Sequence, residues 1–326
     1  MIMRVLILTE GGGKKGHGHL TRCVALYQAF KEKGANPALI VNGDKLVLHL
    51  LEDTNYKIFN WLKNYSKLLK LIRCVDYIVI DSYLAPKSFY NRLSKATSAK
   101  LIMIDDLNRL EYPAGIVLNP SIYGDSLNYS NKDGVMYLLG KKYIILRQPF
   151  WQRPRGICRK NVKNILIAFG GSKQNRFLEK LLDFLLVNFP NYKYHLVAPG
   201  FKPEGRINLN LRTYSNLSAL AMSKLMLKCD LCLSAGGQTL YELVCLGIPV
   251  IAICFADNQL IGLNFFSQKG TIAEVGWHNE NKMWPKLANA FITLLPYEQR
   301  LKMIRAGAAV IDGQGSRRVI KKALIR

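Results

Sequence analysis

The chain has 326 residues, of which 49% are hydrophobic and 21% are charged, a balance typical of folded domains and not of disordered chains. Its 46 basic and 22 acidic residues give a formal net charge of +24, but the basic residues are spread along the chain without a nucleic-acid-binding motif. We therefore predict no nucleic-acid partner. No uninterrupted apolar run reaches the roughly 18 residues that a membrane span needs. Attraction to an anionic substrate and peripheral association with an anionic membrane surface remain open.

The amino terminus and the cysteines both favour a cytoplasmic protein. The first apolar run is too short for a secretory signal and leads into a Gly-rich loop where a cleavage site would be expected. Seven cysteines without framework spacing suit a reducing compartment. Cys229 and Cys232 form a C-x-x-C sequence, but residues three apart on a strand face opposite sides. We therefore predict no metal site and no cofactor.

Strands and helices alternate through the first part of the chain. The predicted strands are Arg4–Thr9, Pro37–Val41, Tyr77–Ile80, Leu101–Ile104 and Val117–Pro120, and the predicted helices are Leu20–Lys33, Lys45–Glu52, Leu62–Arg73 and Pro86–Lys95, with a surface excursion at Tyr123–Gly134. This alternation predicts a doubly wound α/β domain, whose ligands bind beyond the carboxyl ends of its strands.

A stretch rich in Pro and Arg, residues 147–161, lacks periodicity and predicts a domain boundary. The α/β pattern then restarts, with strands predicted at 164–169, 194–198, 211–214, 231–233, 250–254 and 271–274 and helices at 175–188, 217–228, 238–246 and 258–269. We expect one α/β domain over residues 1–150 and a second over residues 151–326, whose C-terminal helices could pack back on the first. The two domains are expected to face a cleft.

The turn at residues 234–237 joins a predicted strand to the amino end of a predicted helix, where free backbone N–H groups and the helix dipole favour an anion. Gly236 and Gly237 let the backbone approach a phosphate closely, and Glu242 could accept hydrogen bonds from sugar hydroxyls. Alternatively, the turn needs small residues only for packing. Gly170-Gly171-Ser172 resembles the same kind of turn.

Polar residues also follow the strands of the first domain. His19 stands at the start of a predicted helix, whose dipole disfavours the imidazolium, so it is a candidate general base; the alternative is a helix cap. Tyr83 could bind a sugar or position a water, and Asp106 could orient a base, unless either is a structural cap at a strand end.

Motifs along the chain resemble those of one family. They are, in order, Gly16-His-Gly-His-Leu-Thr-Arg22, Asp81-Ser-Tyr83, Asp105-Asp106, Leu118-Asn-Pro120, Lys142-Tyr143, Leu146-Arg147, Phe169-Gly-Gly-Ser172, Ser234-Ala-Gly-Gly-Gln-Thr-Leu-Tyr-Glu242, Ala256-Asp-Asn-Gln259 and Asp312-Gly-Gln-Gly-Ser-Arg317. This order resembles the UDP-sugar hydrolases of pseudaminic acid biosynthesis, relatives of the lipid II glycosyltransferase with a GT-B fold.

The resemblance implies removal of UDP from UDP-2,4-diacetamido-2,4,6-trideoxy-β-L-altrose, by water attack at the anomeric carbon with inversion and without metal. It implies that His19 is the base and that Tyr83 and Asn258 are further catalytic residues. The residues implied to bind the UDP-sugar are Gly18, Gly171, Ser172, Ser234, Gly236, Gly237, Gln238, Thr239, Glu242 and Gln259. The glycine loop departs from the family pattern because it is longer and carries Lys14, Lys15 and His17.

Two other functions remain open at this stage. One is a GT-B glycosyltransferase with a nucleotide-sugar donor, in which His19 deprotonates a hydroxyl of a glycan or lipid acceptor. The other is a non-enzymatic module that binds a nucleotide sugar or associates with an anionic surface.

Overall fold

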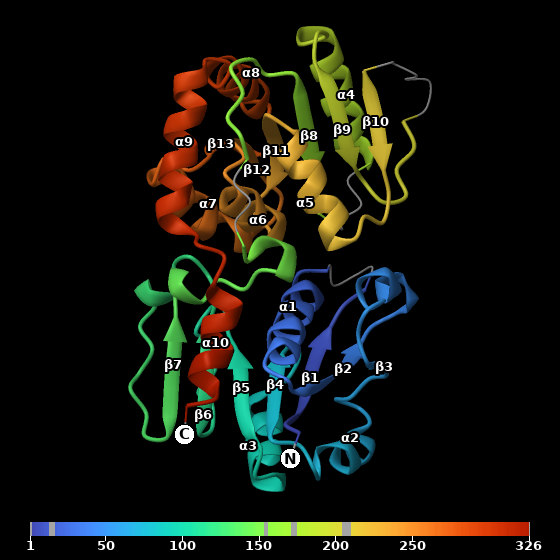
Figure 1. Ribbon diagram of the computed structural model, residues 1–326, viewed down its shortest axis with the longest axis vertical. Helices are drawn as coiled ribbons and strands as arrows, with labels where there is room; N and C mark the ends of the chain where they lie inside the picture. The colour runs from blue at the N-terminus through green and yellow to red at the C-terminus, as the bar shows by residue number, and fades with distance from the viewer. Residues whose placement is uncertain (1, 13–16, 153–155, 171–174, 204–209, 326) are drawn as a thin grey trace. The chain divides into compact units, whose positions relative to one another are not determined.

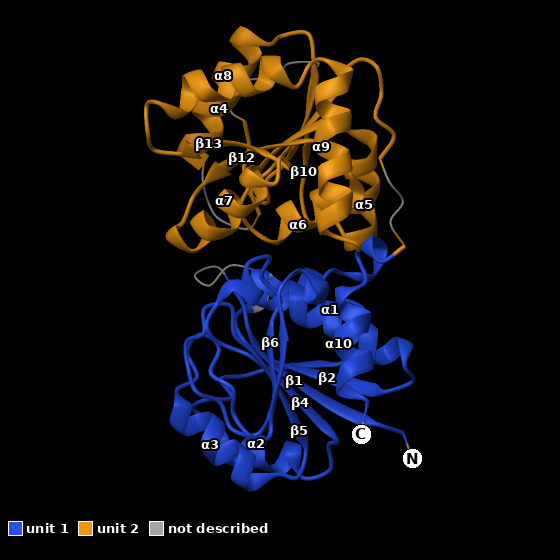
Figure 2. Ribbon diagram, turned by 90° about the vertical axis from the view of Figure 1, so that its left-hand side faces the viewer, with its two compact units in different colours: residues 1–151, 313–326 blue, residues 152–312 orange. Residues whose placement is uncertain are grey.

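The computed structural model describes residues 2–12, 17–152, 156–170, 175–203 and 210–325. By its contacts the chain divides into two compact units, residues 1–151 with 313–326, and residues 152–312 (Figure 2). Each unit contains one parallel sheet. Residues Gly313–Arg326 lie far along the chain from the rest of the first unit, so this unit is assembled from two separate pieces of sequence.

The first unit has a seven-stranded sheet in the order β3-β2-β1-β4-β5-β6-β7 (Figure 1). Its strands are β1 (Arg4–Glu10), β2 (Asn36–Asn42), β3 (Tyr56–Ile58), β4 (Tyr77–Asp81), β5 (Lys100–Ile104), β6 (Gly115–Asn119) and β7 (Val135–Leu139). Its helices are α1 (Gly18–Glu32), α2 (Tyr65–Ile72), α3 (Lys87–Ala96) and α10 (Gly315–Ala323), with short 3₁₀ helices η1 (Lys45–Leu50), η2 (Gly124–Ser126), η3 (Lys141–Tyr143) and η4 (Gln148–Phe150). The strand order reverses at β1 and β4, the position where doubly wound sheets bind ligands.

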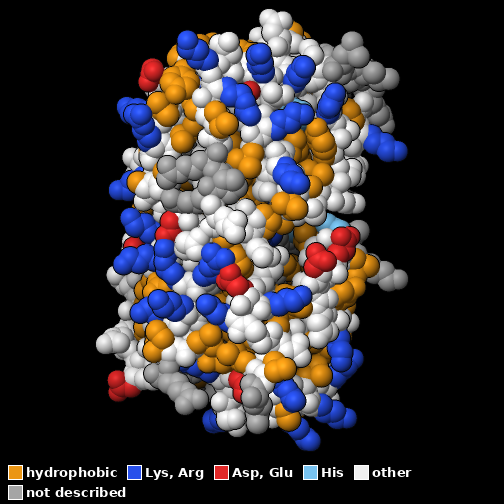
Figure 3. Space-filling view, viewed as in Figure 1, with side chains coloured by type: hydrophobic (Ala, Val, Ile, Leu, Met, Phe, Trp, Pro, Cys, Tyr) orange, Lys and Arg blue, Asp and Glu red, His pale blue; other side chains and the backbone are white. Residues whose placement is uncertain are grey.

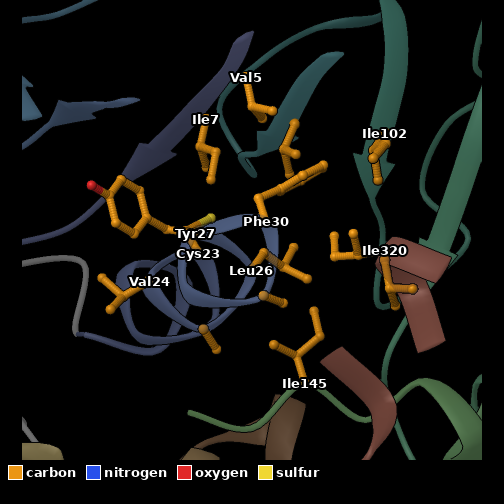
Figure 4. Close-up of a cluster of buried hydrophobic side chains, with 14 of the residues drawn as sticks. Val5, Ile7, Cys23, Val24, Leu26, Tyr27, Phe30, Ile102, Ile145 and Ile320 are labelled. Carbon is orange, nitrogen blue, oxygen red and sulfur yellow. The ribbon is translucent and has the colours of Figure 1, made fainter. Parts of the chain in front are cut away.

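Helix α1 packs between the sheet and α10. Its residues Cys23, Leu26 and Phe30 recur on one face and are fully buried against β1 (Figure 4). Ile320 of α10 belongs to the same apolar cluster, and Arg317 forms an ion pair with Glu32 at the end of α1. The C-terminal helix therefore covers the helix that carries His19. Helices α2 and α3 contribute to a separate apolar cluster on the other face of the sheet.

The second unit has a six-stranded sheet in the order β10-β9-β8-β11-β12-β13. Its strands are β8 (Asn164–Ala168), β9 (Lys193–Val197), β10 (Leu211–Tyr214), β11 (Leu231–Ala235), β12 (Val250–Cys254) and β13 (Ala273–Trp277). Its helices are α4 (Asn175–Asn188), α5 (Ala219–Lys228), α6 (Gln238–Leu246), α7 (Leu260–Gln268), α8 (Met283–Thr293) and α9 (Tyr297–Val310), with the 3₁₀ helix η5 (Asp257–Gln259) before α7. Here the strand order reverses between β8 and β11, so the turn before α6 lies at the switch point.

Most predicted elements are confirmed, and α4, α6 and β12 have the predicted bounds. The edge strands β3 and β7 were not predicted. Strand β3 has only three residues, none of them fully buried, whereas β7 is a continuous apolar run in which a single residue is buried. The helix predicted over residues 45–52 is the 3₁₀ helix η1.

Basic side chains are scattered over the visible face (Figure 3). Within the described ranges, no helix combines the length and the apolar character needed to cross a membrane.

A buried arginine fixes the start of the second unit. The Arg300 side chain is fully buried, and its guanidinium donates to the carbonyl oxygens of Arg159 at 2.9 Å, Lys160 at 2.8 Å and Leu295 at 3.4 Å. Helix α9 thereby holds the segment that leads into β8.

Replacing Arg300 by Met should leave these carbonyl oxygens without a donor, because a buried acceptor that loses its partner retains the full cost of desolvation. We expect Arg300→Met to lower the free energy of unfolding by on the order of 3 kcal/mol, measured by urea denaturation. Arg305→Met, at an exposed position of the same helix, should leave the midpoint unchanged. Equal midpoints for the two variants would contradict the assigned role.

Candidate functional site

A cluster of charged side chains lies at the carboxyl edge of the first unit's sheet. His19 is in the first turn of α1, and Asp81 ends β4, the strand paired with β1. His19 Nδ1 lies 2.6 Å from Asp81 Oδ1. The two residues are brought together because the loop after β1 and the end of β4 meet at the point where the strand order reverses.

Arg22 joins this pair to a second carboxylate. It lies one helical turn after His19, and its Nε donates to Asp81 Oδ2 at 2.5 Å. Its Nη1 donates to both oxygens of Asp106, at 2.7 and 2.8 Å. The Tyr83 hydroxyl also donates to Asp106, at 2.7 Å. The five side chains therefore form one continuous network.

The charge state of Asp81 determines which nitrogen of His19 carries the proton. Burial alone would raise the pKa of Asp81, but the Arg22 guanidinium and then His19 hold it well below its ordinary value. Asp81 is thus an ionised acceptor, and His19 Nδ1 must be the donor across 2.6 Å. Arg22 Nη2 lies 3.2 Å from the same nitrogen but donates to Asp81 Oδ1 at 2.7 Å. His19 Nε2 is then the basic nitrogen.

Tyr83 packs beside the imidazole. The two rings are edge to face, with centroids 4.6 Å apart. Burial and the Asp106 carboxylate raise the pKa of Tyr83, so the phenol stays protonated at neutral pH and acts as a donor. The sequence suggested that Asp106 orients the base. The structure corrects this: Asp81 contacts His19, while Asp106 holds Arg22 and Tyr83.

The second unit places a small-residue turn at the start of α6. Gln259 Oε1 accepts from the Gly236 N–H at 3.3 Å and from the Phe255 N–H at 3.1 Å, which links this turn to the loop after β12. Gly237 is the residue before α6, and open space surrounds the position of its absent Cβ. Gln238 and Thr239, in the first turn of α6, are half-buried. A backbone so accessible at a helix amino end suits an anionic group.

The other predicted binding residues are placed differently. Ser234 is fully buried, and its hydroxyl donates to the Ala168 carbonyl at 3.0 Å. Glu242 is 1% exposed within α6. Asn258 is exposed in η5, and Gly18 is exposed at the start of α1. Gly171, Ser172, Lys14 and Lys15 lie outside the described residues.

The two cysteines of the C-x-x-C sequence, Cys229 and Cys232, are both buried and free. Burial and then Asp230 raise the pKa of Cys229 to about 12, and burial also raises the pKa of Cys232, so both remain thiols. In the part of the chain that the structure describes, no group of three or more His, Cys, Asp or Glu side chains has an arrangement able to hold a metal ion.

The fold defines the class of protein to which the chain is similar. MurG of Acinetobacter baumannii superposes with a TM-score of 0.63 and 16% identity over 98% of this chain and 99% of that chain. UGT89C1 of Arabidopsis thaliana, complexed with UDP, superposes with a TM-score of 0.65 and 12% identity over 99% of this chain and 100% of that chain. The predicted GT-B-like fold of two Rossmann-like domains is therefore confirmed. No family model matches the chain.

Sequence comparison adds particular relatives. The chain is 30% identical over 279 residues to the pseudaminic acid cytidylyltransferase and UDP-2,4-diacetamido-2,4,6-trideoxy-β-L-altropyranose hydrolase of Helicobacter pylori, covering 82% of this chain and 47% of that protein. It is 24% identical to the spore coat polysaccharide biosynthesis protein SpsG of Bacillus subtilis, over 97% of this chain and 96% of that protein. An uncharacterized protein of Methanocaldococcus jannaschii is 28% identical over 77% of this chain and 55% of its own length. The chain thus spans about half the length of two relatives and nearly all of SpsG.

The Asp81 network predicts a specific pH dependence of stability. The folded pKa of Asp81 lies below the unfolded value of about 3.9, so its stabilising effect is present above that pH and is lost as the pH falls further. We expect Asp81→Asn to lower the free energy of unfolding by about 3 kcal/mol at pH 7, and by progressively less below about pH 4, in urea titrations.

Asp133→Asn, at an exposed position of the same unit, is the matched control and should not change stability at either pH. If the difference in free energy of unfolding between the wild type and Asp81→Asn stayed constant from pH 7 to pH 3, Asp81 would not be held ionised by Arg22 and His19.

Proposed function

We propose that this protein is a nucleotide-sugar hydrolase that removes UDP from UDP-2,4-diacetamido-2,4,6-trideoxy-β-L-altrose, by water attack at the anomeric carbon with inversion. The observation that carries the proposal is the His19 imidazole, whose Nδ1 proton is held by the ionised Asp81 while Nε2 is left as a base. Support comes from the hydrolase named in the H. pylori relative, which is 30% identical over 279 residues, and from the family resemblance of the motifs described in the sequence analysis.

In this mechanism His19 Nε2 removes a proton from the attacking water. Asp81 orients the ring and stabilises the imidazolium that forms, while Arg22 keeps Asp81 ionised and in place. A positioned general base of this kind contributes a factor of about 10² to 10⁴ in rate. Tyr83, in edge contact with the imidazole, limits its rotation and offers a polar group for sugar or water.

The turn before α6 is the proposed site of the leaving diphosphate. Backbone N–H groups at a helix amino end, together with the helix dipole, stabilise the negative charge that accumulates on UDP as the glycosidic bond breaks. Gly237, Gln238 and Thr239 are the proposed contacts. Asn258 and Gln259, from η5, are proposed to bind the substrate beside this turn, where Gln259 already contacts Gly236. Gly18, which is exposed at the start of α1, is also a proposed substrate contact, and Ser234 and Glu242, which are buried in the second unit, are proposed to support the turn before α6.

A glycosyltransferase is the second candidate, because the solved structures with this fold include the glycosyltransferases CalG4 and SpnG. The same base would then deprotonate an acceptor hydroxyl in place of water. The two reactions differ in whether an acceptor is required for UDP release.

The first test measures UDP release from the UDP-sugar without any acceptor. We expect turnover by the wild type, and a loss of about 10² to 10⁴ in kcat for His19→Gln and for Asp81→Asn, since the former removes the base and the latter lets the imidazole adopt the wrong tautomer. Circular dichroism checks that both variants are folded. Release that begins only when a glycan or lipid acceptor is added would favour the transferase, and full activity of His19→Gln would remove the base assignment.

Two neighbouring glycines offer a matched test of the phosphate site. A Cβ at Gly236 would lie 2.8 Å from Gln259 Cβ and 2.9 Å from Leu263 Cγ, whereas a Cβ at Gly237 meets no heavy atom within 4 Å. We expect Gly236→Ala to lower the free energy of unfolding by about 1 to 3 kcal/mol. Gly237→Ala should fold normally but bind UDP about tenfold more weakly by calorimetry, because its methyl group occupies the space for the phosphate.

Unchanged UDP affinity of a folded Gly237→Ala protein would exclude this turn as the diphosphate site.

A further inference from the structure

The loop that carries Tyr83 has no regular structure of its own. Residues Ser82–Leu84, here called the Tyr83 loop, connect β4 to the segment before α3. Ser82 is fully buried and Leu84 is 54% exposed, so the loop runs from the interior to the surface. The phenol nevertheless meets Asp106 at 2.7 Å and packs on His19. Because the loop has no strand pairing of its own, side-chain contacts must fix its position relative to His19 and Asp106.

Arg109 binds the backbone of this loop. Its Nη2 donates to the Ser82 carbonyl at 2.8 Å and its Nη1 donates to the Tyr83 carbonyl at 2.9 Å. Two donors of one planar guanidinium thus bind two successive peptide carbonyls, and a lysine side chain cannot reproduce this geometry. The charge lies 5.6 Å from the centroid of the Tyr83 ring.

Arg109 is itself fixed relative to Asp106. Its backbone N–H donates to Asp105 Oδ2 at 2.8 Å, and the Leu107 N–H donates to the other oxygen of Asp105 at 3.1 Å. The short segment after β5 therefore supplies both groups that define the position of Tyr83. Asp106 holds its hydroxyl, and Arg109 holds its backbone.

The opposite side of the loop is held by Glu10, the last residue of β1. This carboxylate is buried, accepts from the Ser82 hydroxyl and accepts from the Leu84 N–H at 3.4 Å. The Ser82 Oγ in turn accepts from the Ala85 N–H at 3.0 Å. The Tyr83 loop is thus fixed between β1 and the segment after β5.

The arrangement is costly if its purpose is only to satisfy the backbone. Arg109 Nε is buried and has no partner of regular hydrogen-bond geometry, although the guanidinium interacts with the buried hydroxyls of Tyr90 and Tyr112. The guanidinium also fixes the positions of the two peptide groups that flank the Tyr83 Cα.

We propose that Arg109 is a positioning residue for the catalytic network: by gripping the backbone of Ser82 and Tyr83, it holds the phenol against Asp106 and the imidazole of His19. This inference rests on the proposed hydrolase function, and it adds a residue that does not touch the substrate. A displacement of about 1 Å at a reacting group can cost up to about 10² in rate, so the effect should appear in kcat.

The test is a double-mutant cycle in the UDP-release assay, with Arg109→Lys, Tyr83→Phe and the double variant. We expect Arg109→Lys to lower kcat about tenfold with KM changed less than twofold. In the Tyr83→Phe background the same change should cost less than twofold, because Arg109 acts through Tyr83. Arg92→Lys is the matched control: this guanidinium lies over the Tyr65 ring, 3.7 Å from its centroid, and its replacement should leave kcat unchanged. Multiplicative losses in the cycle would overturn the proposal.

A second measurement is independent of the reaction. Amide hydrogen exchange of residues 82–85, followed by mass spectrometry, should be at least tenfold faster in Arg109→Lys than in the wild type, and unchanged in Arg92→Lys. If the wild type releases no UDP, the hydrolase function fails while the exchange data still decide whether Arg109 holds the loop. Unchanged exchange in Arg109→Lys would overturn the positioning role whatever the activity.

Discussion

The candidate site of the first unit depends on the Arg22 guanidinium between two buried carboxylates. Asp81 ends β4 and Asp106 lies just after β5, so two buried carboxylates lie close together, and burial alone would raise the pKa of Asp81. Arg22 contacts both, and its own pKa is raised well above the ordinary value because the two carboxylates outweigh the burial that would lower it. One cation therefore fixes the charge state of Asp81, the tautomer of His19 and the position of the acceptor for Tyr83.

The sequence predicted the central strands and long helices well because these elements carry the strongest periodic signals. The strands β1, β8 and β12 are continuous apolar runs buried on both faces, and α4 and α6 have apolar residues at helical spacing. The edge strand β3 was missed because it is short and largely exposed, whereas β7 was missed although Val135–Leu139 is a continuous apolar run. The order of the strands within the sheet could not be predicted from the individual residues either. That order decides which side chains meet at the candidate site.

For the site itself, sequence reasoning placed His19, Tyr83 and Asp106 on one edge but paired the base with the wrong carboxylate. The strand order explains which carboxylate contacts His19. Because β4 pairs with β1, Asp81 at the end of β4 lies beside the start of α1, whereas Asp106 follows β5, one strand further from β1. Arg109 was not predicted at all. Its role arises from two backbone carbonyls, and backbone geometry leaves no mark on the residue types of a sequence.

The packing of the C-terminal helix α10 in the first unit affects the order in which the two units fold during synthesis. Helix α1 has its apolar face against the sheet, but Ile320 and its neighbours complete the cluster from the far end of the chain. During synthesis the contiguous second unit can reach its native structure as soon as it leaves the ribosome, while the first unit must wait for α10 before its core closes. The apolar core around α1 would thus be completed last, after the contiguous second unit.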